Sequence, residues 1–172
     1  MRLFLESDFP WGVLMEFHIA LLQDMVRAAH AKKKKVLFHL ELLRGISADE
    51  AGCSLRAKTR DGGIISTRPK VVETAKKNKK LAVFRLFLID SRSLSRGIAL
   101  CRSLEPDYVE LLPGIACGIL PEIQKQIRMP IMCGGLLRSA EQIKACFQAG
   151  ACAVTISDRQ AAYTYRKEQQ EG

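Results

Sequence analysis

Short apolar runs alternate with amphipathic stretches along this chain, and the alternation predicts repeated units of one strand followed by one helix. Seven runs have the length and apolar content of buried strands. The predicted strands are Arg2–Leu5, Val36–Leu40, Gly63–Ser66, Leu81–Leu88, Tyr108–Leu111, Pro130–Cys133 and Ala151–Ile156.

A helical stretch follows each of the first six predicted strands, as at Ile19–Ala31, Asp49–Thr59 and Ala140–Gln148. Local signals mark several helix starts. Ser47 and Ser139 precede an acidic residue in the first turn, as N-caps do, and Pro69 and Pro121 suit a first turn, where the missing N–H costs nothing.

Consecutive strand–helix units require a parallel sheet with right-handed crossovers, which either closes into a barrel or stays open. Polar residues at strand ends all along the chain, and small polar loops after the last two strands, favour closure. We therefore predict an α/β fold, a TIM-barrel-like (β/α) barrel forming one domain over residues 1–172, with the tail 159–172 frayed. Such a barrel needs eight strands and seven are predicted, so either the first unit is missing from this chain or the barrel is incomplete, with Asp8–Phe17 as an irregular cover.

Composition narrows the class of protein. A hydrophobic fraction of 48% is ordinary for a globular chain, and no apolar run approaches the roughly 20 residues that span a bilayer. Glu6 comes too early for a signal peptide, so we expect a cytoplasmic protein with no membrane partner. The six cysteines show no metal-ligand spacing and are expected to be reduced, mostly buried thiols, with no metal site. The net charge of +9 favours a polyanionic partner or an acidic ligand.

The loops after the last two predicted strands suit a phosphate group. Two adjacent glycines let the backbone approach an anion and present N–H groups to it, and the next unit adds a hydroxyl. A bare glycine turn is the alternative. The predicted phosphate-binding residues are Gly134, Gly135 and Ser157.

Charged residues also stand inside or at the ends of predicted strands. Strand alternation places His39 and Glu41 on one face, and Arg85 inside an apolar strand requires a partner, for which Glu110 or Glu41 is expected. The pairing is either purely structural or part of a site for ligand hydroxyls. The candidate polar contacts are Glu41, Arg85, Asp90, Glu110, Ser66, Thr67 and Arg68.

Catalysis has no clear sequence signal. No lysine stands mid-strand for a Schiff base and no metal-binding motif occurs, so we name no catalytic residue, although strand-end carboxylates and His39 have the chemistry of general acids and bases. His18 and His30 are expected to be surface or capping residues.

Two lysine runs each follow a predicted helix and precede a strand. Cations at helix C-termini are favoured by the macrodipole, and contact with a polyanion is the other explanation. The candidate RNA-binding residues are Lys32, Lys33, Lys34, Lys35, Lys76, Lys77, Lys79 and Lys80.

The order of short motifs resembles the glycerol-3-phosphate responsive antiterminators of bacteria. The matching pieces run from about residue 2 to residue 158. They are Phe38-His39-Leu40-Glu41 with Gly45-Ile46-Ser47, Gly63-Ile64-Ile65-Ser66-Thr67-Arg68, Arg85 to Ser91, Pro106-Asp107 with Glu110 to Gly114, Gly134-Gly135-Leu136, and Ala149-Gly150-Ala151 with Ser157.

The resemblance implies a TIM-barrel-like regulator rather than an enzyme, with sn-glycerol 3-phosphate as ligand, no cofactor, and leader RNA of glycerol-utilisation genes as partner, permitting transcription past a terminator. It leaves a homo-oligomer open. Family members begin with a further strand and helix, and this chain departs from their pattern there and after Ser157. The alternatives are a phosphosugar-metabolising barrel enzyme of the isomerase or lyase type, or a phosphate-binding barrel that has lost its activity.

Overall fold

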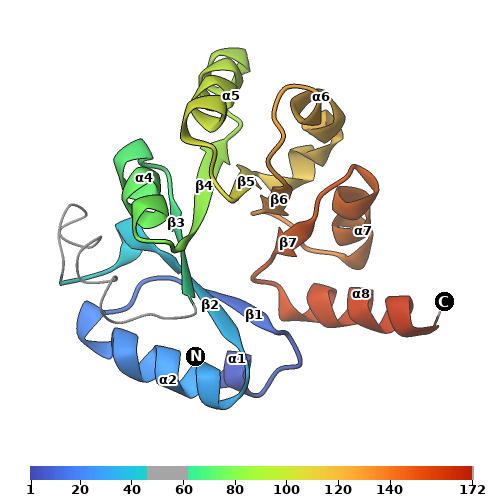
Figure 1. Ribbon diagram of the computed structural model, residues 1–172. Coiled ribbons are helices and arrows are strands. Elements are labelled where there is room, and N and C mark those ends of the chain that lie inside the picture. The colour runs from blue at the N-terminus through green and yellow to red at the C-terminus, as the bar shows by residue number, and fades with distance from the viewer. Residues whose placement is uncertain (46–61, 172) are drawn as a thin grey trace. The chain divides into compact units, whose positions relative to one another are not determined.

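The computed structural model describes residues 1–45 and 62–171 (Figure 1). The chain divides into two compact units, Met1–Val83 and Phe84–Gly172, and strand β4 (Leu81–Phe87) contains the boundary between them. The predicted helix Asp49–Thr59 and its cap Ser47 lie outside the described residues.

The first unit contains three parallel strands. β1 (Trp11–Leu14) pairs with β2 (Lys35–His39), and β2 pairs with β3 (Gly62–Ser66), in chain order. Apolar side chains three to four positions apart bury one face of the helix before β2, as an amphipathic helix requires. The remaining elements are α1 (Arg2–Leu5), the 3-10 helix η1 (Ile19–Leu21), α2 (Leu22–Ala31), the 3-10 helix η2 (Leu40–Leu42) and α4 (Pro69–Lys77).

The N-terminal segment corrects one prediction. Arg2–Leu5 forms a single helical turn, and the strand that pairs with β2 is Trp11–Leu14, inside the stretch expected to be irregular. The Lys34 ammonium holds this segment in place: it donates to the carbonyl oxygens of Ser7 and Phe9 and lies 4.9 Å from the centre of the Phe4 ring. A run of four residues, three of them apolar, is too short to separate a strand from a helical turn by periodicity, so the tertiary contacts decide.

The second unit repeats the strand–helix order. β5 (Tyr108–Leu112) pairs in parallel with β6 (Ile131–Gly134), and β6 with β7 (Ala153–Thr155). In Figure 1 the helices of this unit lie outside its strands. They are α5 (Ser91–Leu104), the 3-10 helix η3 (Gly114–Ile119), α6 (Leu120–Gln124), α7 (Ala140–Gln148) and α8 (Arg159–Glu171).

The helix starts confirm the local signals that the structure describes. The Ser139 hydroxyl accepts from the Gln142 amide at 3.3 Å, and Pro69 and Pro121 lie in the first turns of α4 and α6.

Most of the predicted tail is helical. Residues Arg159–Glu171 form α8, whose Ala161 and Ala162 are buried, and the Tyr165 ring stacks on Phe147 of α7 with ring centres 5.5 Å apart. The polar composition of the tail belongs to the outward face of this helix. Among the described residues, no helix is long and apolar enough to cross a bilayer.

Candidate functional site

A buried ion pair lies at the strand ends of the second unit. Arg85 of β4 donates from Nε to Glu110 Oε2 at 2.7 Å, and Thr155 of β7 donates its hydroxyl to Glu110 Oε1 at 2.7 Å. The Glu110 side chain is fully buried and that of Arg85 is 10% exposed. The expectation that Arg85 pairs with a carboxylate is confirmed, and the partner is Glu110 rather than Glu41.

Of the two residues in this pair, only Arg85 has hydrogen-bonding atoms left for a ligand. Each carboxylate oxygen of Glu110 already accepts a hydrogen bond, so Glu110 positions Arg85 more readily than it binds a ligand. Arg85 uses Nε alone, and within the described residues its two terminal nitrogens have no hydrogen-bond partner. A guanidinium fixed at Nε presents those terminal N–H groups to an oxyanion such as phosphate.

The two predicted phosphate loops meet beside this pair. Gly134 ends β6 and is in register with Thr155 of β7. A Cβ atom on Gly134 would clash with the Thr155 hydroxyl and lie 3.0 Å from Glu110 Oε1, so the close approach of these strand ends requires glycine. Gly135 has a φ of +79°. Ser157 follows two residues after Thr155 and is exposed.

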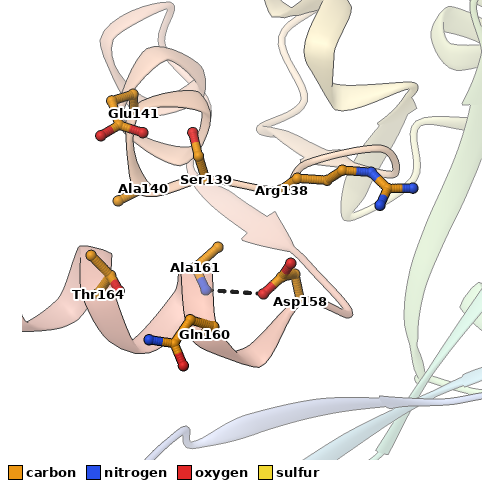
Figure 2. A pocket seen from close by; sticks show the side chains of 8 residues that line it. All are labelled: Arg138, Ser139, Ala140, Glu141, Asp158, Gln160, Ala161 and Thr164. Carbon is orange, nitrogen blue, oxygen red and sulfur yellow. Dashed lines mark hydrogen bonds between the residues drawn. The ribbon is translucent and has the colours of Figure 1, made fainter.

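A separate pocket of about 240 Å³ opens between the starts of α7 and α8 (Figure 2). Both helix starts are already capped, by Ser139 and by Asp158, which accepts from the Ala161 amide at 3.0 Å. Hydrogen bonding to Ser139 lowers the pKa of Glu141. Two carboxylates and occupied caps make this pocket unsuited to phosphate. It is lined by Arg138, Ser139, Ala140, Glu141, Asp158, Gln160, Ala161 and Thr164, and includes none of the predicted phosphate residues.

In the first unit, Glu41 organises the loop after β3. Its Oε1 accepts from the Ser66 hydroxyl, and from the Thr67 amide at 2.8 Å and the Thr67 hydroxyl at 3.2 Å. The Arg68 amide in turn donates to the Ser66 hydroxyl at 3.0 Å. These contacts bring four predicted residues together, while the side chain of Arg68 is exposed.

Glu41 also lies beside His39. Its Oε2 is 3.3 Å from His39 Nδ1, and both side chains are largely buried. Strand alternation predicts that His39 and Glu41 lie on one face of the same strand. The strand ends at His39 and Glu41 lies in η2, but the two side chains still lie next to each other. Two opposing effects act on the pKa of Glu41. Burial acts to raise it, whereas the hydrogen bonds from Ser66, its own amide and Thr67, together with the nearby His39, act to lower it. The lowering effects are larger in sum, so the pKa of Glu41 lies below its ordinary value.

Asp90 serves as a helix cap. It accepts from the Ser93 amide at 2.7 Å, and its own amide donates to the Ser93 hydroxyl at 3.0 Å. The Ser93 amide bond is the main reason that the pKa of Asp90 is lowered. This carboxylate is exposed, and the capping role accounts for its place at the start of α5 without a ligand.

One lysine leaves the predicted RNA-binding set. Lys34 is buried and its ammonium is engaged by the backbone carbonyls described above, so it is unavailable to RNA. The other lysines of the two runs are exposed or half-buried and lie in the last turn of α4 or directly after α2 and α4, where the macrodipole favours cations. Lys33 and Lys79 occupy the left-handed region, with φ of 55° and 54°.

The described cysteines are free, and four of them are buried. Burial raises the pKa of Cys101 to about 12 and that of Cys133 to about 11, so both are protonated at neutral pH. Within residues 1–45 and 62–171, no group of three or more His, Cys, Asp or Glu side chains is arranged to hold a metal ion.

Sequence reasoning missed one member of the ion-pair cluster. Thr155 lies inside the predicted strand Ala151–Ile156, but its bond to Glu110 depends on the register of β6 and β7, which no local sequence signal specifies.

Comparison with known proteins decides the family. The model of the glycerol-3-phosphate responsive antiterminator family matches residues 1–161. The chain belongs to this family. It is 38% identical to the glycerol uptake operon antiterminator regulatory protein of Listeria monocytogenes, with a TM-score of 0.87 over 92% of this chain and 86% of that one. The antiterminator-related protein of Thermotoga maritima is 27% identical, with a TM-score of 0.78 over 88% and 87%. The Escherichia coli K12 protein YgcP is 26% identical over 92% of this chain and 83% of its own length.

These relatives confirm the predicted fold class, and the antiterminator family has a TIM-barrel-like fold that this chain shares. The N-acetylmannosamine-6-phosphate 2-epimerase of Clostridium perfringens, 18% identical, has the same fold with a TM-score of 0.61 over 87% of this chain and 76% of its own. Family and structural relatives together indicate a regulator of glycerol operon antitermination.

Proposed function

We propose that this protein is a transcription antitermination regulator that binds leader RNA of glycerol-utilisation genes in response to sn-glycerol 3-phosphate. The observation that carries the ligand is Arg85, which a fully buried carboxylate fixes at Nε and whose terminal nitrogens have no partner among the described residues. Burying an arginine–carboxylate pair at strand ends carries a desolvation penalty, because both charges lose their hydration. A ligand phosphate would accept hydrogen bonds from the terminal N–H groups of Arg85.

The phosphate contacts in this proposal come from the second unit. Backbone N–H groups of Gly134, Gly135 and Ser157 would bind the phosphate oxygens, with the Arg85 fork as the charged partner. The hydroxyl contacts predicted at Asp90 and at Glu41, Ser66, Thr67 and Arg68 stay predictions.

Calorimetric titration tests the ligand. We expect sn-glycerol 3-phosphate to bind and glycerol to bind far more weakly. A hydrogen bond to a charged group contributes about 1.5–3 kcal/mol, so Arg85→Met should weaken binding by about 10- to 100-fold. Arg128→Met, at an exposed arginine before β6, is the matched control. A folded Arg85→Met protein with unchanged affinity would remove Arg85 from the site.

RNA binding is tested separately, with leader RNA titrated at several salt concentrations, with and without sn-glycerol 3-phosphate. Contacts to RNA phosphates release counterions, so the affinity must fall as salt rises. RNA affinity that ignores both ligand and salt would contradict the proposal.

A phosphosugar-metabolising enzyme is the second candidate, and the His39–Glu41 contact favours it. A histidine held 3.3 Å from a carboxylate is an arrangement suited to a general base. Turnover of a panel of small phosphate esters, abolished by Glu41→Gln, would support the enzyme. Absence of turnover across the panel, with ligand binding retained, would support the regulator.

A further inference from the structure

Four large apolar side chains are exposed at the strand ends of the second unit. Phe87 is 46% exposed, Ile89 82%, Ile115 50% and Leu136 61%. Phe87 ends β4 and Ile89 lies two residues beyond it, Ile115 lies in η3 after β5, and Leu136 follows Gly135 after β6.

Backbone hydrogen bonds show that these loops adjoin. The Leu88 amide, between Phe87 and Ile89, donates to the Leu112 carbonyl at the end of β5 at 2.7 Å. The Gly114 amide, next to Ile115, donates to the Gly135 carbonyl, next to Leu136, at 3.0 Å. The four side chains therefore follow one continuous row of strand ends. We call Phe87, Ile89, Ile115 and Leu136 the apolar strip.

Exposed arginines flank the strip at helix starts. Arg92 lies in the first turn of α5, Arg138 directly before the cap of α7, and Arg159 at the first position of α8. In Figure 2 the Arg138 guanidinium points away from Glu141. Cations are unfavourable at helix N-termini, and none of the three side chains forms an ion pair with any described residue. Helix electrostatics therefore does not explain them, in contrast to the lysine runs.

We infer that the apolar strip and its arginines form the surface that binds unpaired bases of RNA. This inference rests on the proposed function and assigns a surface to it. Sequence-tolerant binding of single strands combines an aromatic side chain on which a base stacks with cations that contact the phosphates. This row of strand ends offers Phe87 as the stacking side chain, three aliphatic side chains that add apolar contact, and the flanking arginines. The net charge of +9 makes the protein as a whole attractive to a polyanion.

The same placement suggests how ligand and RNA communicate. Leu136 follows Gly135 directly and has a φ of 59°, a conformation unfavourable for leucine. A phosphate bound to the Gly135 N–H would fix this loop, and with it Leu136 and the neighbouring Ile115. Ligand binding then favours one arrangement of the RNA surface, as the coupling of two sites requires.

The test compares surfaces by fluorescence anisotropy, with leader RNA and the full chain. Two double variants change the proposed surface. One replaces flanking arginines, Arg92→Gln with Arg138→Gln, and the other replaces residues of the apolar strip, Ile115→Ser with Leu136→Gly, where glycine suits the positive φ. Arg128→Gln is the charge control, Leu21→Ser the control for an exposed apolar side chain, and Lys32→Gln with Lys33→Gln and Lys35→Gln tests the opposite strand ends. The thermal midpoint verifies that each variant is folded.

We expect each pair of strip substitutions to weaken RNA binding about tenfold or more, the strip-arginine pair also to reduce the salt dependence, and both controls to bind like the unmodified protein. Loss of binding in the lysine variant alone, with strip variants unaffected, overturns the inference and leaves the proposed function intact. RNA binding absent from the unmodified protein overturns both. If the apolar pair fails to fold, the arginine pair, which is exposed, decides alone.

Discussion

The ion pair between Arg85 and Glu110 gives the sharpest prediction about stability. Glu110→Gln keeps the shape of the side chain but leaves the Arg85 guanidinium, 10% exposed, facing a neutral amide. Arg85→Met leaves the fully buried Glu110 with the Thr155 hydroxyl as its remaining side-chain donor. Removing one partner of a buried pair costs about 3–5 kcal/mol, and we expect each single variant to lose about that much free energy of unfolding.

The double variant, Arg85→Met with Glu110→Met, separates the pair from its burial. Replacing both charges by apolar side chains of similar volume leaves no uncompensated charge, so it should be more stable than either single variant. In a double-mutant cycle the double loss should be smaller than the sum of the single losses by about 2 kcal/mol or more.

Urea unfolding followed by far-UV circular dichroism is the assay, because the single tryptophan, Trp11, lies in the first unit and the pair in the second. Single losses that add to within about 0.5 kcal/mol would refute the coupling. The double variant also tests the ligand: a folded protein that no longer binds sn-glycerol 3-phosphate shows that the pair serves the site as well as the fold.

Three further outcomes follow from named contacts. The lowered pKa of Glu41 means that its contribution to stability is present above the unfolded-state pKa, near 4.5, and is lost as pH falls through the folded-state value. Urea midpoints between pH 5 and 3 should therefore fall less steeply in Glu41→Gln than in the unmodified protein, and equal slopes would contradict this. Gly134→Ala should destabilise the protein by about 1–3 kcal/mol, because its Cβ clashes with Thr155, and Thr155→Ala should relieve part of that loss; the same urea assay measures both, and a neutral Gly134→Ala would refute the clash. Lys33→Gly and Lys79→Gly should each increase the free energy of unfolding by up to about 1 kcal/mol and so raise the thermal midpoint, because glycine has no steric penalty at positive φ. A lowered thermal midpoint would show instead that the lysine side chains stabilise these turns.

Strands and helices could be predicted where the apolar pattern was long enough to be unambiguous. The predicted strand Leu81–Leu88 exceeds the observed β4 by one residue, and the predicted helix Ala140–Gln148 coincides with α7. The strand predicted at Arg2–Leu5 was wrong because a four-residue run fits a helical turn as well as a strand. The outcome depended on Lys34, whose role in anchoring the N-terminal segment has no local signal.

The candidate site was predictable to the level of residue type. An arginine inside an apolar strand implies a carboxylate partner, but two carboxylates were available, and only the strand register selects Glu110. Asp90 shows why a polar residue at a strand end is an ambiguous signal. It also starts the next helix, and its role as the helix cap explains a carboxylate at this position without a ligand.

The surplus of positive charge divides according to where it lies on the helices. Lysines in the last turn of α4 and directly after α2 and α4 complement the helix dipoles, so the fold alone accounts for them. Arg92, Arg138 and Arg159 stand at the opposite ends of helices, where the dipole opposes them, and no described carboxylate pairs with them. A charge that costs stability in the free protein is retained when a bound anion compensates it. The proposed function has a phosphate ligand and an RNA target, and under that proposal the strand ends with the arginines, rather than the lysine runs, are the surface where electrostatics points to a function.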